Sequence, residues 1–387
     1  MKNINHKPRV AVVYPYIPAY HIAFLKELLS SSEIDFEMFA GTTTGPINLK
    51  VIGSSLSEDT AVNFKRLPNI WFLGNFLWQK GVVTLSWSHK YDVIIHAGNA
   101  YYVSTWLACM VGRLVGVKAL MKTHGMLRAE TGTKGAIRCL FYRLAWGLLL
   151  YERRAKELLV KKEFNSERLY VTFNSLDYAT QKKVRSGLSS EGSRSLRASI
   201  FSEPDLPLLI FIGRLTHRKR LDLLLAAMAH LKASGCKVNF ALIGNGPEMK
   251  NLVTETRRLG LDEKVKFLGE IFDESAIGPW LYAADICVSP GEVGLTAIHA
   301  FAYGTPVITH NDFDHQGPEA ESIIENVTGV FFQRDSYESL ATAIHGWVTT
   351  KTDRESVRAS CIGIIEELYN PGFQVKVFSQ AVFDAIG

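Results

Sequence analysis

Short β-branched runs alternate with longer stretches of amphipathic spacing along this chain, a pattern typical of parallel α/β folds. Helical spacing is clear at His21–Leu29 and Val103–Leu114. In the first half the predicted strands are Val10–Tyr14, Phe36–Ala40, Val93–His96, Lys118–Thr123 and Leu169–Phe173. In the second half they are Leu208–Ile212, Val238–Ile243, Val265–Leu268, Ile286–Ser289 and Pro306–Thr309. The repeated rhythm predicts two Rossmann-like domains.

A Gly/Ser-rich segment, Ser186 to Ser195, separates the two halves and has the composition of a linker or surface loop. Near the end, apolar residues recur at helical spacing over Phe373–Ile386. We therefore expect a first domain over residues 1–185, a linker over 186–205 and a second domain over 206–365. Residues 366–387 would form a helix that packs back on the first domain.

Composition favours a folded protein of the cytoplasm. Apolar residues make up 47% of the 387 residues, and the mean hydropathy is +0.05. No apolar run reaches the roughly 18 residues that a bilayer-spanning helix needs, and Met1 to Pro8 lack the apolar core of a secretory signal. The five cysteines are scattered without a CxxC pair, which favours free thiols over disulfides or zinc.

The net charge of +5 hides an asymmetry between the halves. Residues 1–200 hold 27 Lys and Arg against 14 Asp and Glu, whereas the remainder holds 16 against 24. A basic half is attracted to an anionic partner such as membrane lipid, a lipid-linked phosphate or nucleic acid. A solvated surface of incidental sign is the alternative. No nucleic-acid-binding module is recognisable, so we expect none of that class.

Candidate chemistry follows the first strand of the second half. That strand ends at Gly213, where the backbone can approach a ligand closely. Arg214 and Lys219 come next, before a helix begins. A guanidinium fork and an ammonium together can neutralise a leaving diphosphate. A basic surface cap on that helix is the alternative.

Four more glycine motifs follow in order. Ile243-Gly244-Asn245-Gly246-Pro247 makes a tight turn after the second strand, and Val265 to Gly269 ends the third. Ser289-Pro290-Gly291-Glu292-Val293-Gly294-Leu295 leads into a short helix that carries His299, and Gly304-Thr305-Pro306 opens the next strand. Glu321 to Gly329 is the last motif.

This order of motifs over residues 208–348 resembles the second domain of the retaining GT-B glycosyltransferases of family four. Upstream the resemblance is looser: Lys122-Thr123-His124-Gly125 is similar to the family's donor-facing histidine segment, and Phe173 to Asp177 resembles another of its motifs. The resemblance implies a GT-B fold, with two domains facing across a cleft that holds a nucleotide diphosphate sugar.

The resemblance also implies roles for residues. His124, Glu292, Arg214 and Lys219 would be catalytic, and a hexosyl group would pass to an acceptor hydroxyl with retention. The donor, a UDP- or GDP-sugar, would contact Gly213, Arg214, Lys219, Gly244, Leu268, Gly269, Glu292, Val293, Gly294, Leu295 and His299. No metal or other cofactor is implied, since two cations already face the diphosphate.

Two departures from the family pattern stand out. Ungapped from Gly294-Leu295, the family's two glutamates fall on Gly291 and His299, so Glu292 lies one position from the first. The glycine pair that usually follows the family's first strand is replaced by Tyr16 to His21. These changes leave open the donor, the acceptor geometry and which group takes the first glutamate's role.

The basic first half, taken with the resemblance, favours a lipid-linked acceptor in lipopolysaccharide, O-antigen or capsule synthesis at the inner face of the cell membrane. A GT-B nucleotide-sugar epimerase and a non-catalytic nucleic-acid-binding protein are the alternatives. Asp312-Phe313-Asp314 has the form of a metal-binding DxD, but we interpret it as a loop. The aromatic stretch Ile70 to Lys80 is either core or membrane-facing, and the apolar-to-basic stretch Cys139 to Lys162 is equally open.

Overall fold

The computed structural model describes residues 7–45, 62–350 and 353–387. Met1 to His6 of the polar N-terminus lie outside the described residues. The chain divides into two compact units, which we call unit 1 (Met1–Asp177 with Asn370–Gly387) and unit 2 (Tyr178–Tyr369). Each has its own sheet and its own core, so the prediction of two α/β domains is confirmed.

Unit 1 is built on a seven-stranded parallel sheet in the order β3-β2-β1-β6-β7-β8-β9. The five strands predicted here are present within two residues of their expected ends. Two more were not expected, and both are short: β3 and β8. The bounds are β1 Arg9–Tyr14, β2 Asp35–Ala40, β3 Lys65–Arg66, β6 Val93–Ala97, β7 Lys118–Thr123, β8 Gly147–Leu150 and β9 Leu169–Val171.

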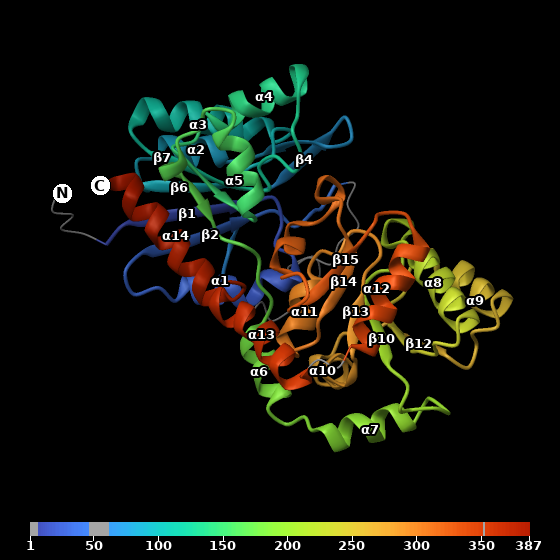
Figure 1. Ribbon diagram of the computed structural model, residues 1–387. Helices are drawn as coiled ribbons and strands as arrows, with labels where there is room; N and C mark the ends of the chain where they lie inside the picture. The colour runs from blue at the N-terminus through green and yellow to red at the C-terminus, as the bar shows by residue number, and fades with distance from the viewer. Residues whose placement is uncertain (1–6, 46–61, 351–352) are drawn as a thin grey trace. The chain divides into compact units, whose positions relative to one another are not determined.

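The helices of unit 1 cover the faces of this sheet, whose central strands are almost wholly apolar and buried. They are α1 Ile22–Leu29, α2 Val82–Trp87, α3 Val103–Val115, α4 Gly132–Tyr142, α5 Arg153–Val160 and α14 Pro371–Ile386. The last of these comes from the end of the chain and packs on α1 and the sheet (Figure 1). Phe378 of α14 lies 5.0 Å from Phe24 of α1 between ring centroids. The prediction that the C-terminal helix packs on the first domain is therefore confirmed.

The aromatic stretch forms a separate two-stranded antiparallel hairpin, β4 Asn69–Phe72 and β5 Phe76–Gln79. Its inner face is anchored to unit 1 by side-chain amides: Asn69 Nδ2 donates to Pro15 O at 2.6 Å and Gln79 Nε2 to Tyr14 O at 2.9 Å. Trp71 packs edge-on against Tyr102. The two interpretations of this stretch are therefore not exclusive, since the hairpin has one packed face and one outer face.

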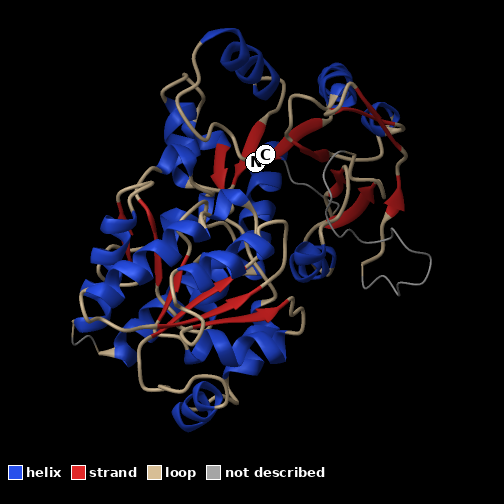
Figure 2. Ribbon diagram, turned by 90° about the vertical axis from the view of Figure 1, so that its right-hand side faces the viewer, coloured by secondary structure: helices blue, strands red, loops and turns tan. Residues whose placement is uncertain are grey.

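Unit 2 is built on a six-stranded parallel sheet in the order β12-β11-β10-β13-β14-β15. In Figure 2 its strands run between helices on both faces. The predicted strands are all present, and β15 was not expected. The strands are β10 Leu208–Ile212, β11 Asn239–Ile243, β12 Val265–Gly269, β13 Ile286–Val288, β14 Val307–His310 and β15 Gly329–Phe332. The helices are α6 Tyr178–Arg185, α7 Ser190–Ala198, α8 Leu221–Ala233, α9 Met249–Arg258, α10 Glu274–Ala283, α11 Thr296–Ala302, α12 Tyr337–Thr349 and α13 Arg354–Glu367.

The expected linker over residues 186–205 is wrong as a place of division. The units divide at residues 177/178 and 369/370 instead, and the expected linker lies within unit 2, where its central part forms helix α7. Ser189 caps this helix by accepting the Gly192 N–H at 3.1 Å. Arg197 then fixes the helix to unit 2 through the Asp285 carboxylate at 2.8 Å. The segment is therefore part of unit 2, although its composition is typical of a loop.

All five cysteines are free, as expected.

Candidate functional site at the carboxyl edge of the unit 2 sheet

The strand order of unit 2 reverses at β10, because β11 and β12 lie on one side of it and β13, β14 and β15 on the other. Ligands of open parallel sheets bind at such a switch point, beyond the carboxyl ends of the strands. The loops after β10 and β13 meet there: the N–H of Gly291 donates to the carbonyl of Lys219 at 3.1 Å.

Glycines bring the strand ends close together at this edge. The N–H of Gly213 donates to Ile243 O at 3.0 Å, and the N–H of Gly244 donates to Gly269 O at 2.7 Å. A Cβ on Gly244 would lie 1.9 Å from Gly213 O, so the approach requires glycine. The predicted residues Gly213, Gly244, Leu268 and Gly269 therefore lie on three adjacent strands.

The two predicted cations have different surroundings. Lys219 Nζ donates to the Glu292 carbonyl at 2.5 Å. Burial lowers the pKa of Lys219, although the nearby Glu292 and Glu319 carboxylates oppose the shift. Arg214 is exposed, and its guanidinium has no hydrogen-bond or ion-pair partner within residues 7–45, 62–350 and 353–387. The site thus holds one anchored cation and one free to meet an anion.

Gly291 explains one departure from the family pattern. A Cβ at this position would lie 1.8 Å from the carbonyl oxygen of Arg218, so a glutamate here requires a different loop. Glu292, the next residue, has a side chain that is 43% exposed and lies 3.9 Å from the guanidinium of Arg218. Glu292 therefore presents a carboxylate at the site where position 291 has no space for one.

The loop from Glu292 to Leu295 presents backbone N–H groups. Within the described part of the chain, those of Glu292, Gly294 and Leu295 have no acceptor. Such groups ahead of a helix are suited to hold an anion. Val293 differs from its neighbours. Its side chain is fully buried and its N–H donates to Gln316 Oε1 at 3.0 Å, so neither is available to a ligand.

His299 faces the interior of unit 2. Its Nε2 lies 2.9 Å from Glu274 Oε1, and the Tyr303 hydroxyl donates to the same oxygen at 2.7 Å. With Glu274 ionised, this contact makes Nε2 the protonated nitrogen. Nδ1 has no partner among the described residues and is not enclosed, so it remains open to an incoming hydroxyl. Sequence patterns carry no signal for Glu274 or Gln316, because their contacts join segments 25 and 23 residues apart.

His124 lies in unit 1, in the loop after β7. The residue is partly exposed, and its ring packs on one side against Tyr151, with ring centroids 4.4 Å apart. The surrounding protein, together with the nearby Lys122 ammonium, lowers the pKa of His124 to about 4, so the ring is neutral near pH 7. The loop is fixed by Thr123 Oγ1, which donates to Gly98 O at 2.8 Å and accepts the Gly125 N–H at 3.1 Å. A neutral imidazole is thus held at the carboxyl edge of the unit 1 sheet.

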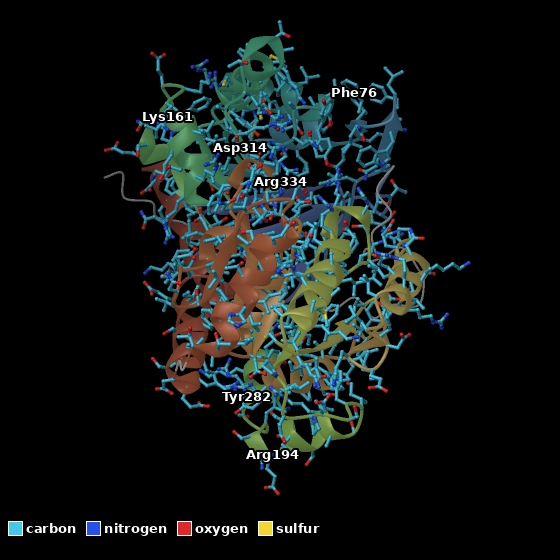
Figure 3. The ribbon with its side chains drawn as sticks, turned by 45° about the vertical axis from the view of Figure 1, so that its right-hand side comes forward. Phe76, Lys161, Arg194, Tyr282, Asp314 and Arg334 are labelled. Atoms are coloured by element: carbon cyan, nitrogen blue, oxygen red, sulfur yellow. The ribbon has the colours of Figure 1, made fainter. Side chains whose placement is uncertain are left out.

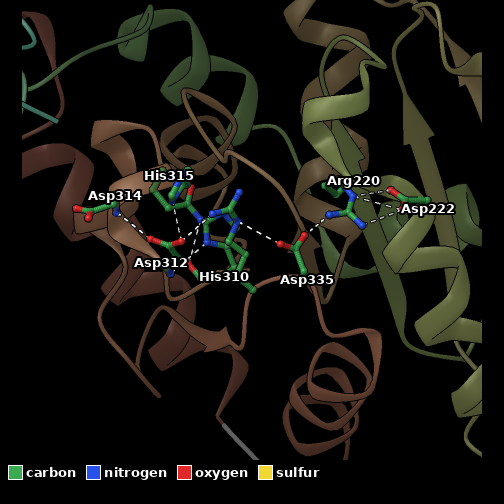
Figure 4. A network of polar contacts seen from close by, with 9 residues as sticks. Arg220, Asp222, His310, Asp312, Asp314, His315 and Asp335 are labelled. Carbon is green, nitrogen blue, oxygen red and sulfur yellow. Dashed lines mark hydrogen bonds and ion pairs between the residues drawn. The ribbon is translucent and has the colours of Figure 1, made fainter. Parts of the chain in front are cut away.

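The segment predicted to be a loop decoration, Asp312 to Asp314, takes part in an ion-pair network of unit 2 (Figure 4). Asp312 accepts from Arg334 and from His315 Nδ1, both at 2.8 Å. Arg334 pairs with Asp335, and Asp335 pairs in turn with Arg220, next to Lys219 in sequence. Figure 3 labels Asp314 and Arg334, two residues of this network. Over the described residues no group of three or more His, Cys, Asp and Glu side chains is arranged to hold a metal ion.

Comparison with known proteins finds a sequence family that matches part of the chain. Residues 193–360 match the family described as Glycosyl transferases group 1. The chain is 33% identical over 166 residues to D-inositol 3-phosphate glycosyltransferase 2 of Catenulispora acidiphila, covering 40% of this chain and 38% of that one. It is 28% identical over 135 residues to alpha-monoglucosyldiacylglycerol synthase of Streptococcus pneumoniae, covering 34% and 30%. The chain therefore aligns with well under half the length of these relatives.

Solved structures match over almost the whole length. Anabaena Alr3699/HepE in complex with UDP has a TM-score of 0.73 at 16% identity, covering 97% of this chain and all of that one. The lipopolysaccharide outer core galactosyltransferase WaaB has a TM-score of 0.69 at 15% identity, covering 97% and 99%. Residues 193–360, less than half of the chain, are thus similar to the glycosyl transferases group 1 family, and the chain as a whole has the fold of GT-B glycosyltransferase structures.

Proposed function

We propose that this protein transfers a hexosyl group from a nucleoside diphosphate sugar to an acceptor hydroxyl, with retention at the anomeric carbon. The proposal rests on one observation at the switch point of unit 2: Lys219 Nζ donates a hydrogen bond to the backbone of the loop that begins at Gly291. There an anchored ammonium, the exposed guanidinium of Arg214 and three free N–H groups are all suited to a diphosphate. The family match over residues 193–360 supports the same reading.

In the proposed reaction the bond between the anomeric carbon and the β-phosphate oxygen breaks, and the acceptor oxygen bonds to that carbon on the same face. The acceptor proton passes to the departing phosphate oxygen. Arg214 and Lys219 stabilise the negative charge that develops on the diphosphate, which lowers the barrier because the charge is largest in the transition state. His299 Nδ1 accepts from a ribose hydroxyl, and neutral His124 donates to the sugar.

The donor and acceptor classes follow from charge and from the relatives. Structures of the similar HepE contain UDP and UDP-glucose, which favours a UDP-sugar here. Unit 1 carries 23 Lys and Arg against 14 Asp and Glu, which favours an anionic, lipid-linked acceptor at a membrane surface. Some relatives have diacylglycerol or phosphatidylinositol in their names. Synthesis of a surface polysaccharide, at the inner face of the cell membrane, is the process that we propose.

The central experiment replaces the two cations separately. A thermal-shift screen with UDP, GDP, ADP, CMP and dTDP first identifies the nucleotide, because a ligand of the native state raises the melting temperature. With the matching sugar donor, Arg214→Ala and Lys219→Ala should each lower kcat/KM by about two to three orders of magnitude. Arg257→Ala, an exposed change on α9, is the control and should be neutral. Wild-type kinetics in both site variants would refute the assignment, and an isomerised donor formed without acceptor would favour an epimerase.

Metal removal is a separate prediction. Asp312 is already engaged by Arg334 and His315, and two protein cations face the diphosphate, so we expect activity to survive EDTA. The measurement is the transfer rate after chelation and gel filtration. Loss of activity that Mn²⁺ or Mg²⁺ restores would instead assign a metal role to the Asp312–Asp314 segment.

A further inference from the structure

Helix α3 of unit 1 has its large apolar residues on the outside. The face that packs on α2 and the strands carries small or hydroxylated residues: Ser104, Thr105, Ala108, Cys109 and Gly112, all buried. The opposite face carries a stripe at helical spacing, Val103, Leu107, Met110 and Leu114, of which the last three are exposed. Leu114 is 83% exposed. In an ordinary surface helix the large apolar side chains face the core and polar side chains face solvent. On α3 the large apolar side chains face solvent instead.

The β4–β5 hairpin repeats this arrangement. Cross-strand pairing places Ile70 opposite Trp78 and Phe72 opposite Phe76 on the outer face. Ile70 and Phe72 are exposed, and the rings of Phe72 and Phe76 stack at 5.8 Å. At the tip, Leu73 is 84% exposed and adopts a positive φ of 44°. An apolar residue held at a strained, fully exposed turn points to a function at that place.

Tyr101 joins the two apolar surfaces. Its ring meets Phe76 edge-on at 5.3 Å, its carbonyl accepts the N–H of Leu77 at 3.1 Å, and it lies two residues before α3. We call the combined surface the α3–hairpin face; it consists of Ile70, Phe72, Leu73, Phe76, Tyr101, Val103, Leu107, Met110 and Leu114. Phe76 and Lys161 lie on opposite flanks of unit 1 in Figure 3. Exposed apolar side chains gathered in this way mark an interaction site.

The chain segment that carries this face is basic, although Lys65 and Lys90 pair with Glu37 of β2. Between residues 63 and 118 Asp92 is the single acidic residue, against six basic residues: Lys65, Arg66, Lys80, Lys90, Arg113 and Lys118. Arg113 directly precedes Leu114 at the end of the α3 stripe, and Lys80 directly follows β5. Apolar side chains among basic ones match the interface of an anionic bilayer, where the former enter the acyl boundary and the latter meet the headgroups.

We propose that the α3–hairpin face docks unit 1 on an anionic lipid bilayer, with α3 lying in the plane of the interface. None of the described helices is long and apolar enough to cross a membrane, so the contact is interfacial. The proposal rests on the proposed function, because it identifies the surface that brings the enzyme to a lipid-linked acceptor. Docking would bury the outer stripe of α3 and the hairpin tip.

The test is co-sedimentation of the full chain with vesicles of phosphatidylcholine containing about one-third phosphatidylglycerol. Leu73→Ser with Leu114→Ser removes the two most exposed members of the face, and both lie outside the core. We expect this double variant to bind at least about tenfold more weakly, and binding of the wild type to weaken, without vanishing, at high NaCl. The matched control is Ile324→Ser with Val327→Ser, two exposed apolar residues of unit 2, which should bind as the wild type does.

Three further measurements on the double variant keep the result interpretable. The double variant should retain its melting temperature, its thermal shift with the nucleotide and its transfer to a soluble acceptor. These readouts report the proposed function, so their failure is distinguishable from failure of the docking surface. Equal vesicle binding by wild type and double variant would overturn the proposal. So would a concentration-dependent dimer in analytical ultracentrifugation that only the double variant loses, since the face would then be an interface between copies.

Discussion

Single residues at the unit 2 site are fixed by the backbone that passes next to them. Gly291 lies against the carbonyl of Arg218, and this contact holds the loop after β13 on the loop that carries Lys219. The same close approach accounts for the absence of a glutamate at this position. The available side chains are therefore those of Glu292, one position further along the chain, and of His299, whose Nε2 contacts Glu274.

Gly291→Ala should disrupt the site through sterics alone. The added Cβ would lie 1.8 Å from Arg218 O, so the two loops must separate. We expect a loss of about 1–3 kcal/mol in the free energy of unfolding of unit 2 and a clear loss of nucleotide affinity. Urea unfolding and thermal shift with the nucleotide measure the two effects. Gly363→Ala on α13 is the control: no atom lies within 4 Å of its added Cβ, and alanine there should stabilise the helix by about 0.5–1 kcal/mol. Unchanged nucleotide binding by Gly291→Ala would contradict the role given to this contact.

At the scale of the element, α14 is the clearest case of a helix whose place only the fold reveals. Asn370 caps it through the N–H of Phe373 at 2.9 Å. Gln374 anchors its first turn to unit 1, accepting from Ser175 Oγ at 2.6 Å and donating to Phe173 O at 2.8 Å. The chain thus leaves unit 1 after Asp177 and returns to it at Asn370, so α14 is part of the unit 1 core.

Two phenylalanines of α14 give a matched pair of variants. Phe378 is fully buried among unit 1 side chains, whereas Phe383 is 37% exposed. Phe378→Ala should cost unit 1 about 3–5 kcal/mol, because it removes buried area and leaves a cavity. Phe383→Ala on the same helix should cost much less. Chemical unfolding followed by circular dichroism compares them, and equal small losses would mean that α14 adds little to the core.

At the scale of the whole molecule, one buried lysine links stability to pH. Lys122 in β7 is 5% exposed; its Nζ donates to Thr172 Oγ1 at 3.1 Å and lies 4.3 Å from the centre of the Tyr151 ring. Burial lowers the pKa of Lys122 from 10.5 to about 7. Above pH 7 the unfolded chain therefore binds a proton that the folded chain has released, and stability must rise with pH until the unfolded lysine titrates.

Lys122→Met should remove this dependence. Between pH 7 and 8.5 we expect the free energy of unfolding of the wild type to rise by up to about 1 kcal/mol per pH unit, whereas that of the variant should stay nearly flat. Lys118→Met, at the exposed start of the same strand, should keep the wild-type slope. The measurement is urea unfolding at a series of pH values. Parallel curves for wild type and Lys122→Met would show that the buried lysine stays charged, held by the surrounding rings of Phe24, Tyr151 and Phe378.

The sequence by itself determined the class of fold and most strands, because apolar runs of the unit 2 sheet, such as Leu208–Ile212 and Asn239–Ile243, have no other stable place than a covered parallel sheet. It also determined the glycines at the strand ends, since only glycine permits the contact of Gly244 with Gly213 O. Three strands of the two parallel sheets were not predicted: β3, β8 and β15.

Only the tertiary structure decided where the units divide, which atoms remain free and what α3 exposes. The segment predicted as a linker belongs to unit 2, and Arg197 of its helix α7 contacts Asp285, 88 residues away. Val293 is withdrawn from the site because Gln316 takes its N–H, and one nitrogen of His299 is occupied because Glu274 lies beside it. The spacing of α3 reveals a helix but not its orientation, since both of its faces lack charge apart from Arg113. Each of these outcomes depends on a partner far away in sequence, and local pattern carries no information about such partners.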